Sequence, residues 1–277
     1  MFRTIASLTL FSVFFGCALA SHAQKVPRVP RAQARMGTDA DNQCDFNFHS
    51  GSLNTFLGYC VSTSGNILLI GVPQGHELLA SGVGADGYGI CDVNSGTAYF
   101  DYSFVGGDSG NWNDPVVVSQ NSTGIKTVRT TSDGIWTLTQ TINLVPSTPS
   151  IKVVMMLKNN TAVNRTATLV RFADINVDSN FSNNFSATGN GAAGWINSDL
   201  ANNVTGLGLQ LQNVGNSPFG FVTGLAQDTF NGPNPCAFAE NASGTPLVGV
   251  DGSIGLAYED TIAAKNAKTA TMIYRGF

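Results

Sequence analysis

The feature that most constrains the fold is a run of alternating apolar and polar residues at 135–143. Its apolar members are Trp136, Leu138 and Ile142, and the threonines between them are Thr137, Thr139 and Thr141. A period of two in β-branched and aromatic residues is typical of a strand with one face in a core. The turn pair Asp133-Gly134 precedes the run and Pro146 follows it, so both ends of the strand are marked.

The same signature recurs along the chain, while helix signals are absent. Further strands are expected at 55–61, 66–72, 97–104, 116–119, 125–131, 151–157, 166–177, 204–211, 219–225, 254–258 and 269–275. The runs at 135–143, 151–157 and 166–177 are joined by short polar links and predict an antiparallel meander. Residues 178–203 are rich in Asn, Ser and Gly and are expected to be irregular. Strands at this spacing predict an all-β fold with few or no helices, a large antiparallel two-sheet sandwich.

The first residues predict export. Arg3 precedes an apolar run at 5–19, and Ser21-His22-Ala23 suits a signal peptidase, so residues 1–23 are interpreted as a signal peptide. Lipidation at Cys17 is the competing interpretation, but the two preceding Phe residues fit it poorly. No later stretch reaches the roughly 18 apolar residues that a transmembrane helix needs. We therefore expect a secreted or periplasmic protein.

Charge divides the rest of the chain into two parts. Residues 24–40 form a basic, proline-containing linker with Lys25, Arg28, Arg31 and Arg35, whereas all 18 acidic residues follow residue 38. Residues 41–277 show no break in composition and are expected to form a single β-sandwich domain. An acidic body lacks the basic face that nucleic acid requires, so no nucleic-acid partner is expected. The sequence leaves the oligomeric state open.

Four cysteines remain after the signal peptide: Cys44, Cys60, Cys91 and Cys236. An even number in an exported chain predicts two disulfides. Three pairings are open, and we favour Cys44 with Cys60, because the short segment between them can turn back on itself. That choice pairs Cys91 with Cys236.

Residues that carry catalysis are scarce. Only His49 and His76 follow the signal peptide, and the glutamates are Glu77, Glu240 and Glu259. No Gly-x-Ser-x-Gly motif marks a nucleophile. Asp is plentiful, so a pair of carboxylates for sugar chemistry stays open. No cofactor is expected apart from calcium.

A calcium site is suggested by one polar run. On a strand, Asp174, Asn176 and Asp178 would share one face, and Ca²⁺ prefers carboxylate and amide oxygens. The simpler interpretation is the polar face of a half-buried strand, with Arg171 pairing locally with an Asp.

Two tryptophans in Gly-rich polar surroundings suggest a carbohydrate-binding site. Trp112 is followed by Asn113 and Asp114, and Trp195 is followed two residues later by Asn197. An exposed indole can stack on a sugar while amides and carboxylates meet its hydroxyls. The alternative is that each Trp closes a loop onto the core.

Residues 131–174 also carry a family resemblance. A strand and turn are followed by a strand closing with Lys158-Asn159-Asn160, and then by a strand with Arg171 and Asp174 in an Arg-x-x-Asp pattern. This order resembles proteins of the galactose mutarotase-like, or supersandwich, type. The later residues Asp251-Gly252-Ser253 and Tyr274-Arg275 are similar to those of secreted bacterial β-sandwich proteins. The resemblance implies a supersandwich fold and a sugar-facing groove, but no mutarotase-type His and Glu pair falls on matching positions.

The leading hypothesis is therefore a non-catalytic exported β-sandwich protein that binds carbohydrate or another cell-surface component. A carbohydrate-active epimerase or hydrolase that uses Asp residues is the first alternative. A structural or adhesive envelope protein is the second.

Overall fold

The computed structural model describes residues 44–80, 86–103, 107–145, 147–196, 206–215, 218–228, 234–237 and 245–277. The expected signal peptide and the whole of the linker lie outside these ranges. The regular elements within them are strands and the short 3-10 turns η2 (Leu53–Thr55) and η4 (Val177–Ser179). The predicted all-β class is confirmed. The described residues include no helix capable of spanning a bilayer.

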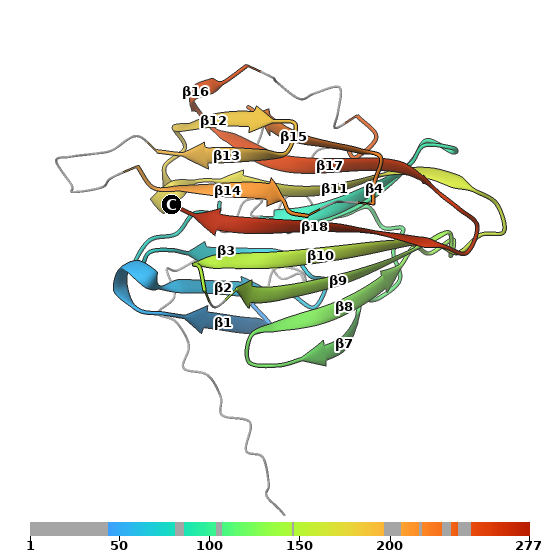
Figure 1. Ribbon diagram of the computed structural model, residues 1–277, viewed down its shortest axis with the longest axis horizontal. Coiled ribbons are helices and arrows are strands. Elements are labelled where there is room, and N and C mark those ends of the chain that lie inside the picture. The colour runs from blue at the N-terminus through green and yellow to red at the C-terminus, as the bar shows by residue number, and fades with distance from the viewer. Residues whose placement is uncertain are drawn as a thin grey trace, which may run out of the picture.

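A nine-stranded sheet forms the layer nearest the viewer in Figure 1. In spatial order its strands are β16 (Leu247–Val250), β12 (Asn183–Thr188), β13 (Gly191–Trp195), β14 (Gly208–Asn213), β18 (Ala267–Gly276), β10 (Ser150–Asn159), β9 (Trp136–Val145), β8 (Gly124–Thr130) and β7 (Val116–Gln120). Neighbouring strands are antiparallel, as β9 and β10 illustrate.

A six-stranded and a three-stranded sheet lie behind it (Figure 1). The six-stranded sheet has the order β15 (Phe221–Gln227), β17 (Gly252–Ile262), β11 (Arg165–Ile175), β4 (Asp86–Asp92), β5 (Thr97–Tyr102) and β6 (Gly107–Asp108). The three-stranded sheet has the order β1 (Phe46–Ser50), β2 (Leu57–Val61) and β3 (Ile67–Gly71). The hydroxyl of Tyr59 on β2 donates to the carbonyl of Thr123, 2.9 Å away, just before β8.

Apolar side chains that alternate along the strands form the core between these layers. On β9, Trp136, Leu138 and Ile142 are buried with at most 1% exposure, and they belong to one apolar cluster that draws on all three sheets. A smaller cluster, which includes Phe172 and Tyr102, lies on the opposite, outer face of the six-stranded sheet. Strand β11 therefore has both faces buried.

A charged network crosses the core at Arg171. Its guanidinium pairs with Asp86 on β4 and donates to Gln140 Oε1 on β9 at 2.8 Å. The same side chain donates to the carbonyl of Gly65 at 3.2 Å and to the hydroxyl of Tyr274 on β18 at 3.0 Å. This network, which we call the Arg171 network, joins all three sheets, with Arg171 paired with Asp86 rather than with a nearby residue of its own strand.

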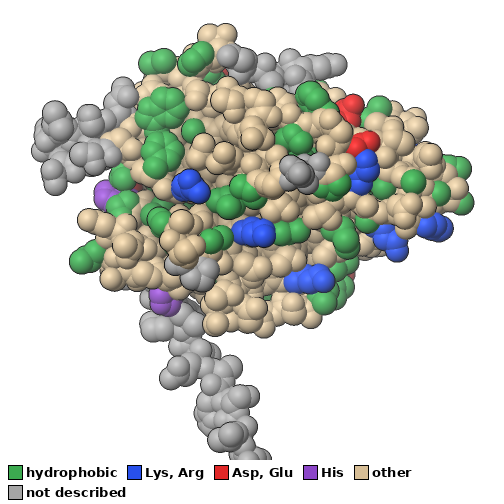
Figure 2. Space-filling model, viewed as in Figure 1, with side chains coloured by type: hydrophobic (Ala, Val, Ile, Leu, Met, Phe, Trp, Pro, Cys, Tyr) green, Lys and Arg blue, Asp and Glu red, His purple; other side chains and the backbone are tan. Residues whose placement is uncertain are grey.

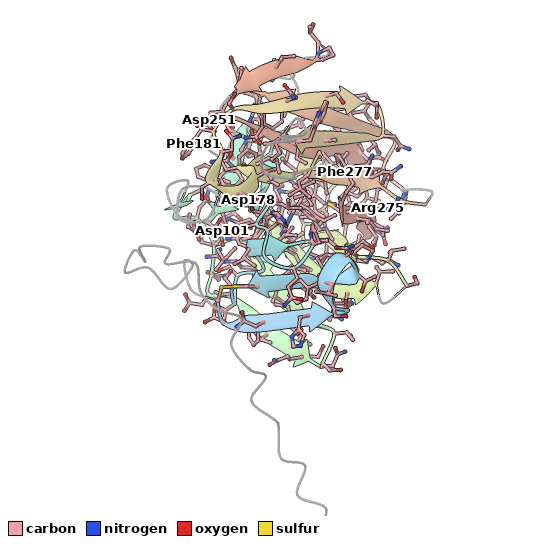
Figure 3. The ribbon with its side chains drawn as sticks, turned by 90° about the vertical axis from the view of Figure 1, so that its left-hand side faces the viewer. Asp101, Asp178, Phe181, Asp251, Arg275 and Phe277 are labelled. Atoms are coloured by element: carbon pink, nitrogen blue, oxygen red, sulfur yellow. A yellow bond between two sulfur atoms is a disulfide. The ribbon has the colours of Figure 1, made fainter. Side chains whose placement is uncertain are left out.

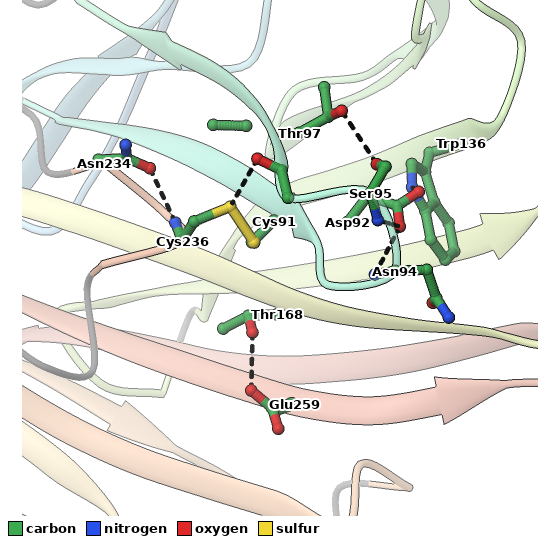
Figure 4. The surroundings of a disulfide bond; sticks show 12 residues. Cys91, Asp92, Asn94, Ser95, Thr97, Trp136, Thr168, Asn234, Cys236 and Glu259 are labelled. Atoms are coloured by element: carbon green, nitrogen blue, oxygen red, sulfur yellow. Dashed lines mark hydrogen bonds between the residues drawn. A yellow bond between two sulfur atoms is a disulfide. The ribbon is translucent and has the colours of Figure 1, made fainter.

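Both disulfides have the pairing favoured from the sequence. Cys44 joins Cys60 with Cα atoms 5.4 Å apart, and Cys91 joins Cys236 at 4.8 Å. Figure 4 shows the second bond, which ties the segment 234–237 to β4. Pro235 then lies against Gly89 on the outer face of the six-stranded sheet.

Three expectations are corrected. The predicted meander breaks after β10, because β11 pairs with β4 and β17 in the other sheet. Residues 178–203 contain the hairpin of β12 and β13. Strand β11 ends at Ile175 and not at Val177, where the chain turns into η4.

Candidate functional site

Trp112 belongs to the core and does not offer a surface for stacking. Its side chain is 9% exposed, and its ring meets those of Tyr88 and Tyr99 edge-on. The indole nitrogen donates to the carbonyl of Phe100 at 3.2 Å. The structure therefore removes Trp112 from the predicted carbohydrate site and leaves Asn113 and Asp114 as exposed loop residues.

Trp195 lies differently, on the outer face of the nine-stranded sheet. The preceding Gly194 faces the core, where an added Cβ would meet Phe185 and Ile175. Since side chains alternate along a strand, Trp195 points outward, and it is half-buried. Asn197, its predicted partner, lies outside the described residues.

A second aromatic ring accompanies Trp195. Gly208 is the register partner of Trp195, and it exchanges two backbone hydrogen bonds with Phe277, at 2.9 and 3.1 Å. A Cβ added at Gly208 would lie 2.6 Å from Phe277 Cζ and 2.6 Å from Trp195 Cβ. Only glycine fits beneath the two, so the surface presents Trp195 and the 52% exposed Phe277 side by side over the buried Gly208.

Polar groups border this aromatic pair. Gln210 and Arg275 are register partners on β14 and β18, and both alternate with buried residues, so they lie on the same outer face as the rings. Arg275 is exposed. We call Trp195, Gly208, Gln210, Arg275 and Phe277 the aromatic patch. Its arrangement offers flat apolar stacking surfaces beside planar hydrogen-bonding groups.

The sheet that carries the aromatic patch has no acidic residue in any of its nine strands. Lys152, Lys158 and Arg275 are exposed on it, and Lys126 is partly exposed. Figure 2 shows basic side chains spread across this face, with acidic ones confined to the upper right. Although the chain carries a formal charge of −4, this face is basic.

The predicted calcium ligands lie elsewhere. Figure 3 places Arg275 and Phe277 toward one side of the molecule, and Asp178, Phe181 and Asp251 toward the other. Asp174 is on β11 and fully buried, and neither carboxylate oxygen meets a hydrogen-bond partner of good geometry among the residues that the structure describes. Burial raises the pKa of Asp174 to about 8, and the nearby Asp251 carboxylate adds to the rise. The backbone N–H of Ile175 nevertheless acts to lower the pKa of this carboxyl group.

Asp178 does not share a strand face with Asp174, because β11 has already ended. It sits in η4 with φ of 53°, and its carboxylate accepts from the backbone of Glu77 at 2.9 Å and contacts His76 Nδ1 at 2.7 Å. The predicted set of three is therefore divided, with Asp174 and the buried Asn176 separated from Asp178.

Glu77 is a titratable group that sequence reasoning did not single out. One of its carboxylate oxygens is buried without a partner. Burial raises the pKa of Glu77 to about 7, and Asp178 adds to the rise. Its place beside η4 comes from a backbone contact, since Asp178 N–H donates to the Glu77 carbonyl at 2.7 Å.

No group of three or more His, Cys, Asp or Glu side chains is arranged to hold a metal ion within the part of the chain that the structure describes. A site for zinc or another transition metal would need such a group. Only a hard cation that accepts amide and carbonyl oxygens suits the residues around Asp174.

Comparison with known proteins supports the fold. No protein-family model matches the sequence, and no curated protein sequence matches it. A bacterial glucoamylase solved in complex with acarbose is similar over 86% of this chain, with a TM-score of 0.55 and 12% identity. This chain corresponds to only 32% of the glucoamylase, so it spans about a third of that protein.

Two sugar epimerase structures also match. An aldose 1-epimerase-like protein from Escherichia coli K12 aligns over 84% of this chain and 99% of its own, with 12% identity and a TM-score of 0.45. A galactose mutarotase-related enzyme from Lactobacillus acidophilus aligns over 84% and 97%, with 8% identity and a TM-score of 0.45.

Proposed function

We propose that this protein is an exported, non-catalytic β-sandwich protein that binds carbohydrate through the aromatic patch. The observation that carries the proposal is the pair of accessible rings, Trp195 and Phe277, separated by Gly208. Aromatic rings stack on the apolar faces of sugars, while Arg and Gln side chains bind hydroxyl and carboxylate groups. The similarity in fold to a glucoamylase solved with acarbose is consistent with a sugar ligand.

The charge of the face indicates which sugars to expect. Arg275, Lys152 and Lys158 are exposed and have no ion-pair partner among the described residues. Cations on a sheet without carboxylates favour an anionic ligand. We therefore propose that acidic glycans, such as uronic-acid polymers, bind more tightly than neutral ones.

Export is the second part of the proposal. The two disulfides suit an oxidising compartment, since cytosolic thiols are kept reduced. Together with the apolar run at 5–19, they support a secreted or periplasmic location. We further propose that residues 41–277 form one domain, because the main apolar cluster draws on all three sheets.

The alternatives have weaker support. An enzyme acting through Asp174 would need substrate to reach a fully buried carboxylate. An adhesive role would draw on the exposed Val116 and Val118 of the edge strand β7, since apolar side chains at a sheet edge promote contact with other chains.

Titration calorimetry with acidic and neutral oligosaccharides tests the proposal. Trp195→Ala and Phe277→Ala should each weaken binding about tenfold, equivalent to about 1.4 kcal/mol. Phe221→Ala is the matched control, because Phe221 is 54% exposed but lies on the other large sheet. Arg275→Gln should reduce the preference for acidic sugars. Unchanged affinity in both aromatic variants, with melting temperatures retained, would refute the aromatic patch as the binding site.

A further inference from the structure

The buried Asp174 belongs to a second polar arrangement, at the boundary of β11 and β17. The two strands pair so that Asp174 faces Ser253 and Ile175 faces Gly252. The same register brings Asn176 opposite Asp251, one residue beyond the paired ends. Asp174 alternates with Phe172 and Val170, which lie in the outer apolar cluster, so Asp174 points to the outer face.

The carboxylate of Asp174 lacks what a buried charge normally requires. The side chain is fully buried and both of its oxygens are without hydrogen-bond partners. Buried carboxylates are normally paired with a cation or with several donors, because desolvating them is costly. The nearest charge with an identified effect on Asp174 is Asp251, which has the same sign. Among the described residues, the arrangement therefore has carboxyl groups and oxygen atoms but no positive group that acts on Asp174.

Asn176 adds oxygen atoms to the same place. One terminal atom of its amide lies 3.2 Å from Asp251 Oδ1 and 2.9 Å from the carbonyl oxygen of Ile175. If that atom is nitrogen, it donates to both. If it is oxygen, it lies 3.2 and 2.9 Å from two other oxygens, the spacing of neighbouring ligands that bind one Ca²⁺ at about 2.3–2.6 Å.

We propose that Asp174, Asn176 and Asp251, with the carbonyl of Ile175, bind a Ca²⁺ ion. Two carboxylates, an amide and a carbonyl are the ligand types that Ca²⁺ prefers, and no thiolate or imidazole is among them. Asp251 takes the position that the sequence had suggested for Asp178. The ion would neutralise the unpaired Asp174 and fix the ends of β11 and β17 to each other.

Thermal unfolding of the full-length mature protein tests the proposal. After treatment with chelator, CaCl₂ should raise the melting temperature by several degrees, because an ion that binds only the folded state stabilises it. MgCl₂ at the same concentration should have less effect, since Mg²⁺ gives up its water reluctantly. Asp174→Asn and Asp251→Asn should abolish the Ca²⁺ response. Asp114→Asn, at an exposed loop residue, is the matched control and should retain it.

Asn176→Asp separates the two roles of the amide. If Asn176 supplies an oxygen ligand, a third carboxylate should tighten Ca²⁺ binding about tenfold in calorimetry. If its amide nitrogen only donates to Asp251, the new carboxylate repels Asp251, lowers the melting temperature without Ca²⁺, and gives no gain in affinity. That second result, or an equal Ca²⁺ response in wild type, Asp174→Asn and Asp251→Asn, would overturn the proposal.

Discussion

Arg171 and Asp174 lie on the same strand, are both fully buried, and meet opposite surroundings. Arg171 points between the sheets, where Asp86, Gln140, Tyr274 and a backbone carbonyl satisfy its donors. Asp174 points to the outer face, where neither oxygen has a partner. The charge of Arg171 is compensated inside the protein, whereas the carboxyl group of Asp174, whose pKa is raised to about 8, has no counter-charge among the described residues.

The difference separates a structural role from a binding role. A buried ion pair whose hydrogen bonds are satisfied fixes the register of the strands that it joins. Removing one partner is strongly destabilising, because the other charge is then left buried and unpaired. A buried carboxyl group without a partner does not stabilise the fold in this way. Its presence needs another explanation, such as a ligand that pairs with it. We therefore assign the Arg171 network a role in the stability of the fold, and Asp174 a role in ion binding.

The largest expected effect on stability comes from breaking the Arg171 network. Arg171→Met should lower the free energy of unfolding by about 3–5 kcal/mol, because Asp86 is left buried without its counter-charge. Urea unfolding followed by circular dichroism measures this loss. Arg275→Met, on the exposed outer face, is the control and should change stability by no more than about 0.5 kcal/mol. Equal losses in the two variants would contradict a structural role for the network.

A smaller effect of opposite sign is expected at Asp174. In chelator, Asp174→Asn should leave the free energy of unfolding unchanged or raise it by about 1 kcal/mol, because no favourable contact of the carboxylate is lost. Asp86→Asn under the same conditions should be destabilising, since its carboxylate pairs with Arg171. If Asp174→Asn lowered the free energy of unfolding as much as Asp86→Asn, the contrast between the Arg171 network and Asp174 would not hold.

The smallest effect is a pH dependence at Glu77. Its pKa is raised from 4.5 to about 7 in the folded protein, mainly by burial and also by Asp178. The folded state thus holds a proton that the unfolded state has released, so stability should fall as pH rises from about 4.5 to 7. Glu77→Gln should flatten this part of the melting-temperature profile. Because His76 contacts Asp178, a His76→Gln variant is the control for the loss of that contact.

Strands with one buried face could be predicted from the sequence. The run at 135–143 matches β9 (Trp136–Val145) because its apolar residues face a core, while Thr137 and Thr141 on the other face are only half-buried. Strand β4 was missed, since Gly87 and Gly89 interrupt the pattern and both of its faces are buried. In β13, Gly194 must be small because Phe185 packs against it, so composition there suggested a loop.

The sites depended on pairings that periodicity does not encode. Alternation predicted Asp174 and Asn176 on one face, but β11 ends at Ile175, and the approach of Asp251 follows from the pairing of β11 with β17, which are far apart in sequence. Gly208 meets Trp195 and Phe277 only through the order β13, β14, β18. Trp112 and Trp195 had similar sequence surroundings, and only tertiary packing distinguished the core residue from the surface residue.

Strand β18 has a consequence for when the protein can fold. It lies between β14 and β10 and joins the four strands on one side of the nine-stranded sheet to the four on the other. It is also the last of the described strands to leave the ribosome, so the two halves stay separate throughout the synthesis of the other strands. Such long-range closure is slow, so the nine-stranded sheet is completed late in folding.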